Sequence, residues 1–292
     1  MELALGVGSS HRRGETRRSV VGRPEGFLFF MNAALDLQHR LEVAIEACRQ
    51  AGKITLAYFQ NNVAVEDKAD GSPVTTADRQ AEAAIRETLA AHFPDDGILG
   101  EEGGLTRGKS GQWIIDPIDG TKSFICGVPL YAVLLAYEHE GQALIGVMNF
   151  PALGEMLWAG HGLGCYWNGS RAHVSNTKTL AEARVTCSDF GMLAEVAGID
   201  VLQELFKKTK LQRTWGDAYG HALVATGRAE IMIDPKMAVW DNGPLLPILE
   251  EAGGRFTTWD GVATIHGGNA IATNGHLHED VRKMLWIENQ KQ

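Results

Sequence analysis

A short apolar strand that ends in carboxylates is the feature that most restricts what this 292-residue chain can fold into. Residues 112–124 read QWIIDPIDGTKSF, so a Trp-Ile-Ile run leads directly into Asp116 and then Asp119. Glu101 and Glu102 lie a little upstream. Because the residue before a proline avoids the helical region, we expect the strand to stop at Asp116. Carboxylates repel one another, so either water must surround these four acids or a cation must lie between them.

Three interpretations of the acidic segment can be compared. A solvated loop fits poorly, because Asp116 directly follows apolar residues. A calcium loop of the EF-hand type needs alternating oxygen ligands, which the sequence after Gly120 does not supply. A divalent-metal site agrees with the preference of hard cations such as Mg²⁺ for carboxylate oxygens. Two such ions would need acids that converge from several elements.

The residues that follow the acids favour phosphate as the second ligand. Gly120 and Thr121 stand where a helix could begin. Free N–H groups at a helix N-terminus bind phosphate, and glycine allows close approach of the backbone. A metal site beside an anion cradle predicts phosphoryl chemistry.

Two acids elsewhere have simpler explanations when each is taken alone. Asp241, in WDNGPLLPILEEAGG, is expected to cap the N-terminus of a helix. Asp78, in SPVTTAD, is expected in the first turn of a helix that starts near Thr76, where a negative charge is favourable.

The hydrophobic pattern divides the chain into two parts and a tail. Residues 1–34 are expected to be a disordered tail or an over-extended gene start with Met31 as the true beginning; the arginine-rich segment lacks a convincing cleavage site for a targeting peptide. Residues 35–175 predict two helices on a mainly antiparallel sheet, with a hairpin turning at Glu140. Residues 176–292 alternate strands with helices, which indicates a more parallel, layered sheet. The expected helices cover 35–59 (with Asp36 as cap), 76–93, 191–208, 217–227, 240–254 and 277–287.

Composition excludes several classes of partner. The net charge is −9 and no long basic block occurs, so we expect no nucleic acid as partner. No apolar run approaches the ~20 residues that a membrane span needs, so we expect no membrane partner. Four cysteines without a CxxC pair are typical of a reduced, cytoplasmic protein.

The chain resembles the inositol monophosphatase family over about residues 36–288. Three motifs in this order carry the resemblance: PVTTAD, GEE…WIIDPIDGT and WDNGPLLPILEEAGG. This resemblance implies a mixed α+β and α/β fold, a layered α-β-α-β-α sandwich with an antiparallel-rich first half and an alternating second half. It also implies a metal-dependent phosphomonoesterase. Within the family, DGTKSF and residues 215–241 are most similar to histidinol-phosphatases.

The resemblance assigns roles residue by residue. It implies two or three Mg²⁺ ions, with Mn²⁺ as a substitute, and an Asp116 that bridges two of them. Thr121 would orient the attacking water with support from Asp78, and Glu101 would share that water. The Gly120 and Thr121 amides would hold the phosphate, and Glu102 would have an outer-sphere role or bind a third ion. The implied metal ligands are Glu101, Asp116, the Ile118 carbonyl, Asp119 and Asp241.

The binding site for a cationic substrate such as L-histidinol phosphate needs acidic residues that do not also bind metal. Asp217 and Asp234 are the candidates, beside Asp119 and Asp241. The alternatives are a helix cap for Asp217 and a turn residue for Asp234. We expect the His221 side chain to face the protein core from its helix. Further expectations are packing for Trp215 and solvent exposure for His276 and His278.

Two departures from the family pattern affect residues near the site. Asn242-Gly243-Pro244 replaces a small, alanine-rich start, and Pro247 is expected to kink the helix and could shift Asp241. Cys126 stands where an arginine is common, which would alter phosphate affinity or expose a thiol.

The leading hypothesis is a Mg²⁺-dependent histidinol-phosphatase of histidine biosynthesis that uses metal-activated water. The alternatives are an inositol-1-monophosphatase or a broad phosphatase of sugars and nucleotides, and, in another class, a non-catalytic metal- or phosphate-binding protein. A small phosphorylated metabolite and a second copy of the chain, in a homodimer, are the expected partners.

Overall fold

The computed structural model describes the backbone of residues 25–61, 64–68 and 71–289. The chain divides into two units at Asp36, and both large sheets and the candidate site belong to the second unit, Leu37–Gln292. Helix α1 (Glu25–Tyr58) begins earlier than predicted, so the expectation that Asp36 caps its start is wrong. The expectations for residues 1–24 lie outside the described residues.

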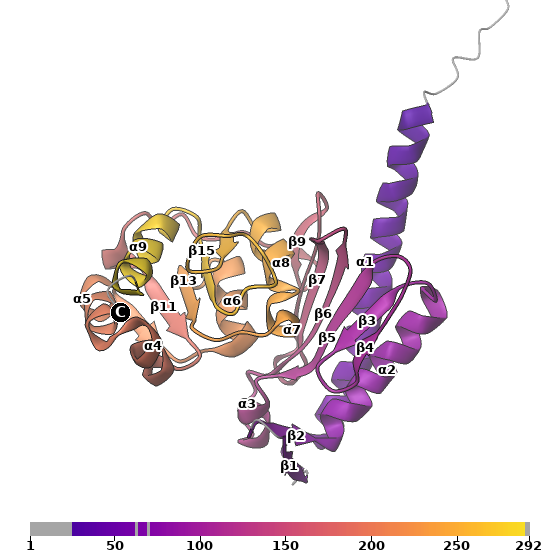
Figure 1. Ribbon diagram of the computed structural model, residues 1–292, viewed down its shortest axis with the longest axis horizontal. Coiled ribbons are helices and arrows are strands. Elements are labelled where there is room, and N and C mark those ends of the chain that lie inside the picture. Colours follow the sequence, from indigo (N-terminus) through magenta and orange to yellow (C-terminus); the bar gives the residue numbers. More distant parts are fainter. Residues whose placement is uncertain (1–24, 62–63, 69–70, 290–292) are drawn as a thin grey trace, which may run out of the picture. The chain divides into compact units, whose positions relative to one another are not determined.

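The larger sheet is antiparallel apart from one pair of strands. Its strand order is β10-β9-β8-β7-β6-β5-β3-β4, and only β3 and β5 run parallel (Figure 1). This confirms the antiparallel-rich first half. The strands are β3 (Gly97–Gly100), β4 (Gly104–Thr106), β5 (Gln112–Asp119), β6 (Ala132–His139), β7 (Gln142–Phe150), β8 (Glu155–Gly160), β9 (Gly164–Trp167) and β10 (Ser170–Arg171).

The predicted hairpin turn between β6 and β7 is confirmed. His139 pairs with Gln142, and the two residues between them, Glu140 and Gly141, have φ of 51° and 76°. Two consecutive positive φ values match the right-handed twist of the flanking strands.

The smaller sheet is mixed. Its strand order is β12-β11-β13-β15-β14, with β12, β11 and β13 parallel and β13, β15 and β14 antiparallel. The predicted parallel pairing therefore holds for half of this sheet. Along the sequence, all strands of the larger sheet come before residue 175 and all strands of the smaller sheet come after it. The predicted domain boundary at this residue stays a prediction. The strands are β11 (Arg184–Cys187), β12 (Leu211–Arg213), β13 (Ile231–Asp234), β14 (Arg255–Thr257) and β15 (Ala270–Thr273).

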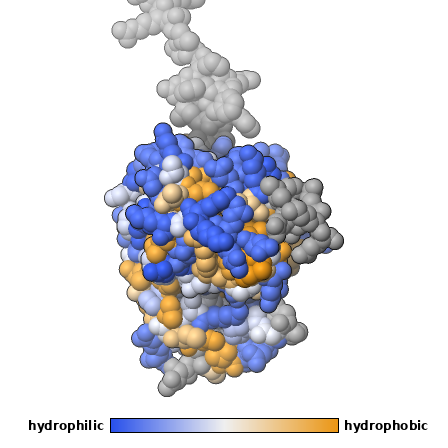
Figure 2. All heavy atoms as spheres, turned by 90° about the vertical axis from the view of Figure 1, so that its left-hand side faces the viewer, coloured by the Kyte–Doolittle hydropathy of each residue, from blue (hydrophilic) through white to orange (hydrophobic). Residues whose placement is uncertain are grey.

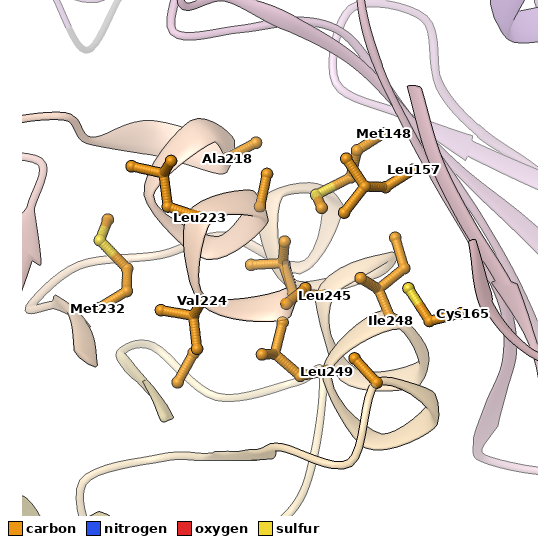
Figure 3. Packing of buried hydrophobic residues seen from close by; sticks show 14 of the residues in the cluster. Met148, Leu157, Cys165, Ala218, Leu223, Val224, Met232, Leu245, Ile248 and Leu249 are labelled. Atoms are coloured by element: carbon orange, nitrogen blue, oxygen red, sulfur yellow. The ribbon is translucent and has the colours of Figure 1, made fainter. Parts of the chain in front are cut away.

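Three hydrophobic clusters join these sheets and the helices into five layers. One cluster packs α1 and α2 on one face of the larger sheet, a second packs α6 and α8 between the two sheets, and a third packs α4, α5 and α9 on the smaller sheet (Figure 1). Figure 3 shows the middle cluster, where Leu249 of α8 and Val224 of α6 lie among residues of both sheets. The predicted α-β-α-β-α sandwich is confirmed. The helices are α2 (Thr76–His92), α3 (Thr121–Ile125), α4 (Phe190–Ala197), α5 (Ile199–Lys208), α6 (Asp217–Ala225), α7 (Val239–Asn242), α8 (Leu245–Glu251) and α9 (His278–Asn289).

Several local predictions are wrong. Strand β5 does not stop at Asp116 but continues to Asp119, because an irregularity in its pairing with β6 accommodates the proline between them. Strands β1 (Val65–Asp67) and β2 (Pro73–Thr75) pair antiparallel ahead of α2, where no strand is predicted. The helix expected over 191–208 is broken at Gly198, which has φ of 95°.

The face that carries α4, α5 and α9 is largely hydrophilic, with smaller apolar areas (Figure 2). Exposed apolar residues on α4 and α5 include Val196, Ile199 and Phe206. Among the described residues, none of the helices combines the length and the apolar character that crossing a bilayer requires.

Candidate active site

Three of the predicted metal ligands come together at the end of β5. One carboxylate oxygen each from Asp116, Asp119 and Asp241 lies within 4.8 Å of the other two. Asp116 and Asp119 belong to β5, and Asp241 comes from α7, more than a hundred residues later. The irregularity in β5 lets two aspartates three residues apart point to the same place.

Burial and mutual repulsion disfavour negative charge at this cluster. Burial raises the pKa of Asp116 well above its usual range, and the charges of Glu101, Asp119 and Asp241 raise it further. Burial likewise raises the pKa of Asp241 to about 6. Within the described part of the chain, no lysine or arginine forms an ion pair with these three aspartates. Clustered buried carboxylates without a fixed counter-charge fit a hard divalent cation.

Backbone N–H groups fix each of the three carboxylates. Asp116 accepts a hydrogen bond from the Ile118 N–H at 3.0 Å, and Asp119 accepts one from the Ala218 N–H at 2.7 Å. Asp241 accepts one from the Ala238 N–H at 2.7 Å. Asp241 therefore caps the start of α7, as predicted, but from the third helical position, since Ala238 is the N-cap residue.

The acidic pair at residues 101 and 102 shares one lysine. The Lys68 ammonium lies 2.7 Å from Glu101 Oε1 and 2.5 Å from Glu102 Oε1. The charge of Glu101 raises the pKa of Asp116, so Glu101 lies near the aspartate cluster. Lys68, which follows β1, was not among the predicted site residues.

A buried glutamate of α2 holds the turn that carries this pair. Glu82 accepts hydrogen bonds from the N–H groups of Glu102 and Gly103, both at 2.8 Å, and pairs with Arg86 at 2.6 Å. A Cβ atom at Gly100 would lie 2.2 Å from the Glu82 carboxylate, so this turn requires glycine. Sequence reasoning missed Glu82, since an acid in a helix gives no sign of a distant backbone partner.

Asp78 and Thr121 each form hydrogen bonds within their own segment. Asp78 accepts from the Thr75 N–H at 2.8 Å and from the Thr75 hydroxyl at 2.6 Å, which forms a capping box at the start of α2. The Thr121 hydroxyl donates to the Ile118 carbonyl at 3.1 Å. The predicted pairing of Thr121 with Asp78 stays a prediction.

Gly120 satisfies two requirements at the start of α3. Its φ of 77° favours glycine, and a Cβ atom there would lie 2.9 Å from Asp217 Oδ2. Because α3 begins at Thr121, the first N–H groups of this helix have no acceptor within the helix. The predicted phosphate-binding role of Gly120 and Thr121 is compatible with this backbone and stays a prediction.

A cavity of about 490 Å³ adjoins the aspartate cluster. It brings Asp217 and Asp234 together with Asp119 and Asp241, and Lys122 and Lys236 also line it. Its remaining wall is partly apolar and includes Val128, Leu130, Met192, Met237 and Leu245.

The two additional carboxylates of the cavity are held by polar neighbours. Asp217 is the first residue of α6 rather than its cap, with φ of 52°, and its carboxylate accepts from the Ser123 hydroxyl at 3.4 Å. Asp234 ends β13 and accepts from the Ser188 N–H at 3.3 Å. His221 Nε2 lies 3.0 Å from Asp234 Oδ2. His221 is buried, as predicted, but its contact with Asp234 was not foreseen.

Other expected residues differ in their outcomes. Trp215 is 42% exposed, and its predicted packing role stays a prediction. His278 is buried between Thr257 and Thr273 rather than solvated, whereas His276 is exposed. Cys126 is exposed. The helix predicted from Trp240 is interrupted at Gly243 and Pro244, which separate α7 from α8. Pro247 lies inside α8.

Comparison with known proteins decides the family. The model of the inositol monophosphatase family matches residues 36–290. This chain belongs to that family. A histidinol-phosphatase of Chlorobaculum parvum is 44% identical over 80% of this chain and 94% of its own length. A histidinol-phosphatase of Mycobacterium tuberculosis is 39% identical over 84% of this chain and 97% of its own. The solved structure of a Thermotoga maritima IMPase superposes with a TM-score of 0.80 at 32% identity, over 87% of this chain and 99% of that one.

The chain is therefore a phosphomonoesterase, a hydrolase of small phosphorylated substrates, in a family whose members depend on metal ions. The acidic cluster supplies the kind of ligands that such a family member needs. This assignment overturns the alternative of a non-catalytic binding protein.

Proposed function

We propose that this enzyme hydrolyses L-histidinol phosphate to L-histidinol and phosphate, with Mg²⁺ as its metal. One observation carries the proposal: a single cavity joins the metal-site acids Asp119 and Asp241 to two further carboxylates, Asp217 and Asp234. A phosphomonoester that also carries a cationic group suits such a cavity, because the metal site would bind its phosphate and the two further carboxylates its cation. The identity of 44% and 39% to two histidinol-phosphatases supports the same substrate.

The metal ions would be held by Glu101, Asp116, Asp119, Asp241 and the Ile118 carbonyl, with two or three Mg²⁺ bound and Mn²⁺ able to replace them. When bound, such ions neutralise phosphate charge, lower the pKa of a bound water and stabilise the leaving oxygen. In this proposal residues 35–175 carry most of the ligands. Residues 176–292 carry Asp241 and the acids that select the substrate.

The chain's own groups position the reactants, which supplies most of the catalysis in phosphoryl transfer. The Gly120 and Thr121 amides hold the phosphate, and the Thr121 hydroxyl orients the attacking water for in-line displacement. Asp78, fixed by Thr75, supports Thr121, and Glu101 shares the water. Glu102 acts from outside the metal sphere through Lys68.

The ammonium group of the substrate is bound by Asp217 and Asp234. Both carboxylates line the cavity, and in the described part of the chain neither forms an ion pair with lysine or arginine. A cationic ligand would therefore relieve the cost of two like charges that share a desolvated site.

The direct test measures phosphate release from L-histidinol phosphate and from myo-inositol 1-phosphate side by side, with purified protein and Mg²⁺. The proposal predicts a higher kcat/KM for L-histidinol phosphate. Faster turnover of the inositol ester would replace it with the alternative of an inositol monophosphatase, which the likeness to a solved IMPase supports. Action in histidine biosynthesis, a cytoplasmic location and assembly as a homodimer belong to the same proposal.

A further inference from the structure

The two ring nitrogens of the buried histidine of α6 differ in their hydrogen bonding. His221 is 1% exposed, and its Nε2 lies 3.0 Å from Asp234 Oδ2. Its Nδ1 is buried and has no hydrogen-bond partner among the described residues. An ionised carboxylate only accepts hydrogen bonds, so the proton belongs on Nε2. A second proton on Nδ1 would leave a buried donor unsatisfied, so the neutral Nε2–H tautomer fits best.

Asp234 therefore receives two fixed hydrogen bonds. The Ser188 N–H reaches Oδ1 at 3.3 Å, and the His221 ring donates to Oδ2. Ser188 follows β11 and Asp234 ends the parallel neighbour β13, where Cys187 pairs with Ile233. The two residues thus meet at the carboxyl edge of the sheet, where open α/β sheets bind ligands.

These two donors orient Asp234 without neutralising it. A carboxylate has about four lone-pair sites, so two remain for a ligand in the cavity that Asp234 lines. Lysine or arginine in place of His221 would cancel the negative charge, whereas a neutral imidazole leaves it intact. A packing role alone, against Phe256 at 6.0 Å between ring centroids, would not require a nitrogen that faces the carboxylate.

We infer that His221 is a positioning residue for substrate specificity: its Nε2–H donates to Asp234 Oδ2 and orients this carboxylate toward the ammonium group of the substrate. This inference rests on the proposed function, because the ammonium belongs to L-histidinol phosphate. His221 itself touches neither the substrate nor the metal ligands in this account, so its removal should change discrimination between substrates more than the chemical step.

The experiment compares L-histidinol phosphate with desamino-histidinol phosphate, the same ester without its ammonium group. His221→Phe keeps a ring of similar size and removes the donor. It should raise KM for L-histidinol phosphate roughly 10-fold to 100-fold, the range for a lost hydrogen bond to a charged group. KM for the desamino ester and kcat for both esters should stay within about twofold. His221→Gln, which can still donate, should recover part of the discrimination.

A matched control is available at the surface. His266 Nε2 lies 2.6 Å from Glu138 Oε1, which is the same kind of pair, but the His266 side chain is 55% exposed and does not line the cavity. His266→Phe should leave the preference between the two esters unchanged. Circular dichroism of every variant checks that the fold is kept.

The outcomes separate the inference from the proposed function. A wild-type enzyme that does not prefer L-histidinol phosphate over its desamino analogue refutes the proposed substrate. If the wild type has this preference and the His221→Phe variant keeps it, the positioning role is refuted and the proposed substrate is not. If both His221 variants fail to fold, ¹⁵N-histidine spectra of the wild type provide the test. A buried, neutral Nε2–H ring whose signal moves when L-histidinol is added supports the inference. An imidazolium, or a signal that does not move, overturns it.

Discussion

Replacing Asp241 by asparagine is expected to stabilise the metal-free protein and to remove most of the stabilisation by metal. Burial raises the pKa of this carboxyl from 3.8 to about 6, so the folded state binds a proton more tightly than the unfolded state does. The stabilising contribution is complete below about pH 4 and is lost as the pH rises through about 6. At 1.36 kcal/mol per pKa unit, ionised Asp241 costs the folded, metal-free protein at most about 3 kcal/mol at pH 8.

Asparagine keeps the acceptor for the Ala238 N–H and removes the charge. In EDTA at pH 8, Asp241→Asn should therefore raise the free energy of unfolding by up to about 3 kcal/mol, with little difference near pH 3.5. With Mg²⁺ at a hundred times its dissociation constant, the wild type should gain about 2.7 kcal/mol and the variant much less.

Urea denaturation followed by circular dichroism, at both pH values and with EDTA or Mg²⁺, measures these differences. Asp95→Asn is the matched control, because the Asp95 side chain is 70% exposed and should change stability by less than about 0.5 kcal/mol. An Asp241→Asn variant that is no more stable than the wild type at pH 8 in EDTA would refute the electrostatic reasoning. So would a variant that retains the full gain from Mg²⁺.

Three further substitutions test other parts of the structure. Gly120→Ala should lower kcat/KM at least about tenfold, because it adds a Cβ atom 2.9 Å from Asp217 Oδ2 at a positive φ. Gly154→Ala controls for the effect of φ alone, because Gly154 has φ of 63° and a Cβ atom added there would have no neighbour within 4 Å. Glu82→Gln should weaken Mg²⁺ binding roughly 10-fold to 100-fold in titration calorimetry, because the turn that carries the acidic pair loses its ionic anchor; unchanged affinity would contradict this. Leu249→Ala, in the cluster of Figure 3, should lower the free energy of unfolding by about 2–5 kcal/mol in urea, and a loss below 1 kcal/mol would contradict tight packing there.

Local structure could be predicted wherever neighbouring residues determine it. The turn at Glu140 and Gly141 follows from alternating strands on either side, and the start of α2 follows from Thr75 and Asp78, which cap each other. Strand β5 was predicted too short because its continuation past Asp116 depends on pairing with β6, which lies further along the chain. The sequence around His278 suggested a solvated helix start, but Thr257 and Thr273 of the smaller sheet enclose it.

The same distinction applies to the candidate site. Asp116, Asp119 and Asp241 could be selected because their motifs are specific, and the structure brings their carboxylates together. Their fixation could not be predicted, because its donors are distant, as when the Ala218 N–H binds Asp119. The contact of His221 with Asp234 likewise depends on how α6 packs beside β13. Such contacts follow from tertiary packing, and no local pattern in the sequence marks them.

Titration of Mg²⁺ into the wild type and into Asp116→Asn, followed by phosphate release from L-histidinol phosphate, shows whether these aspartates hold the catalytic metal. Asparagine preserves the acceptor for the Ile118 N–H, so the fold should remain intact. We expect saturable Mg²⁺ binding and Mg²⁺-dependent turnover in the wild type, and the loss of both in the variant. Turnover by the wild type in excess EDTA, or full Mg²⁺ binding and activity in Asp116→Asn, would contradict it.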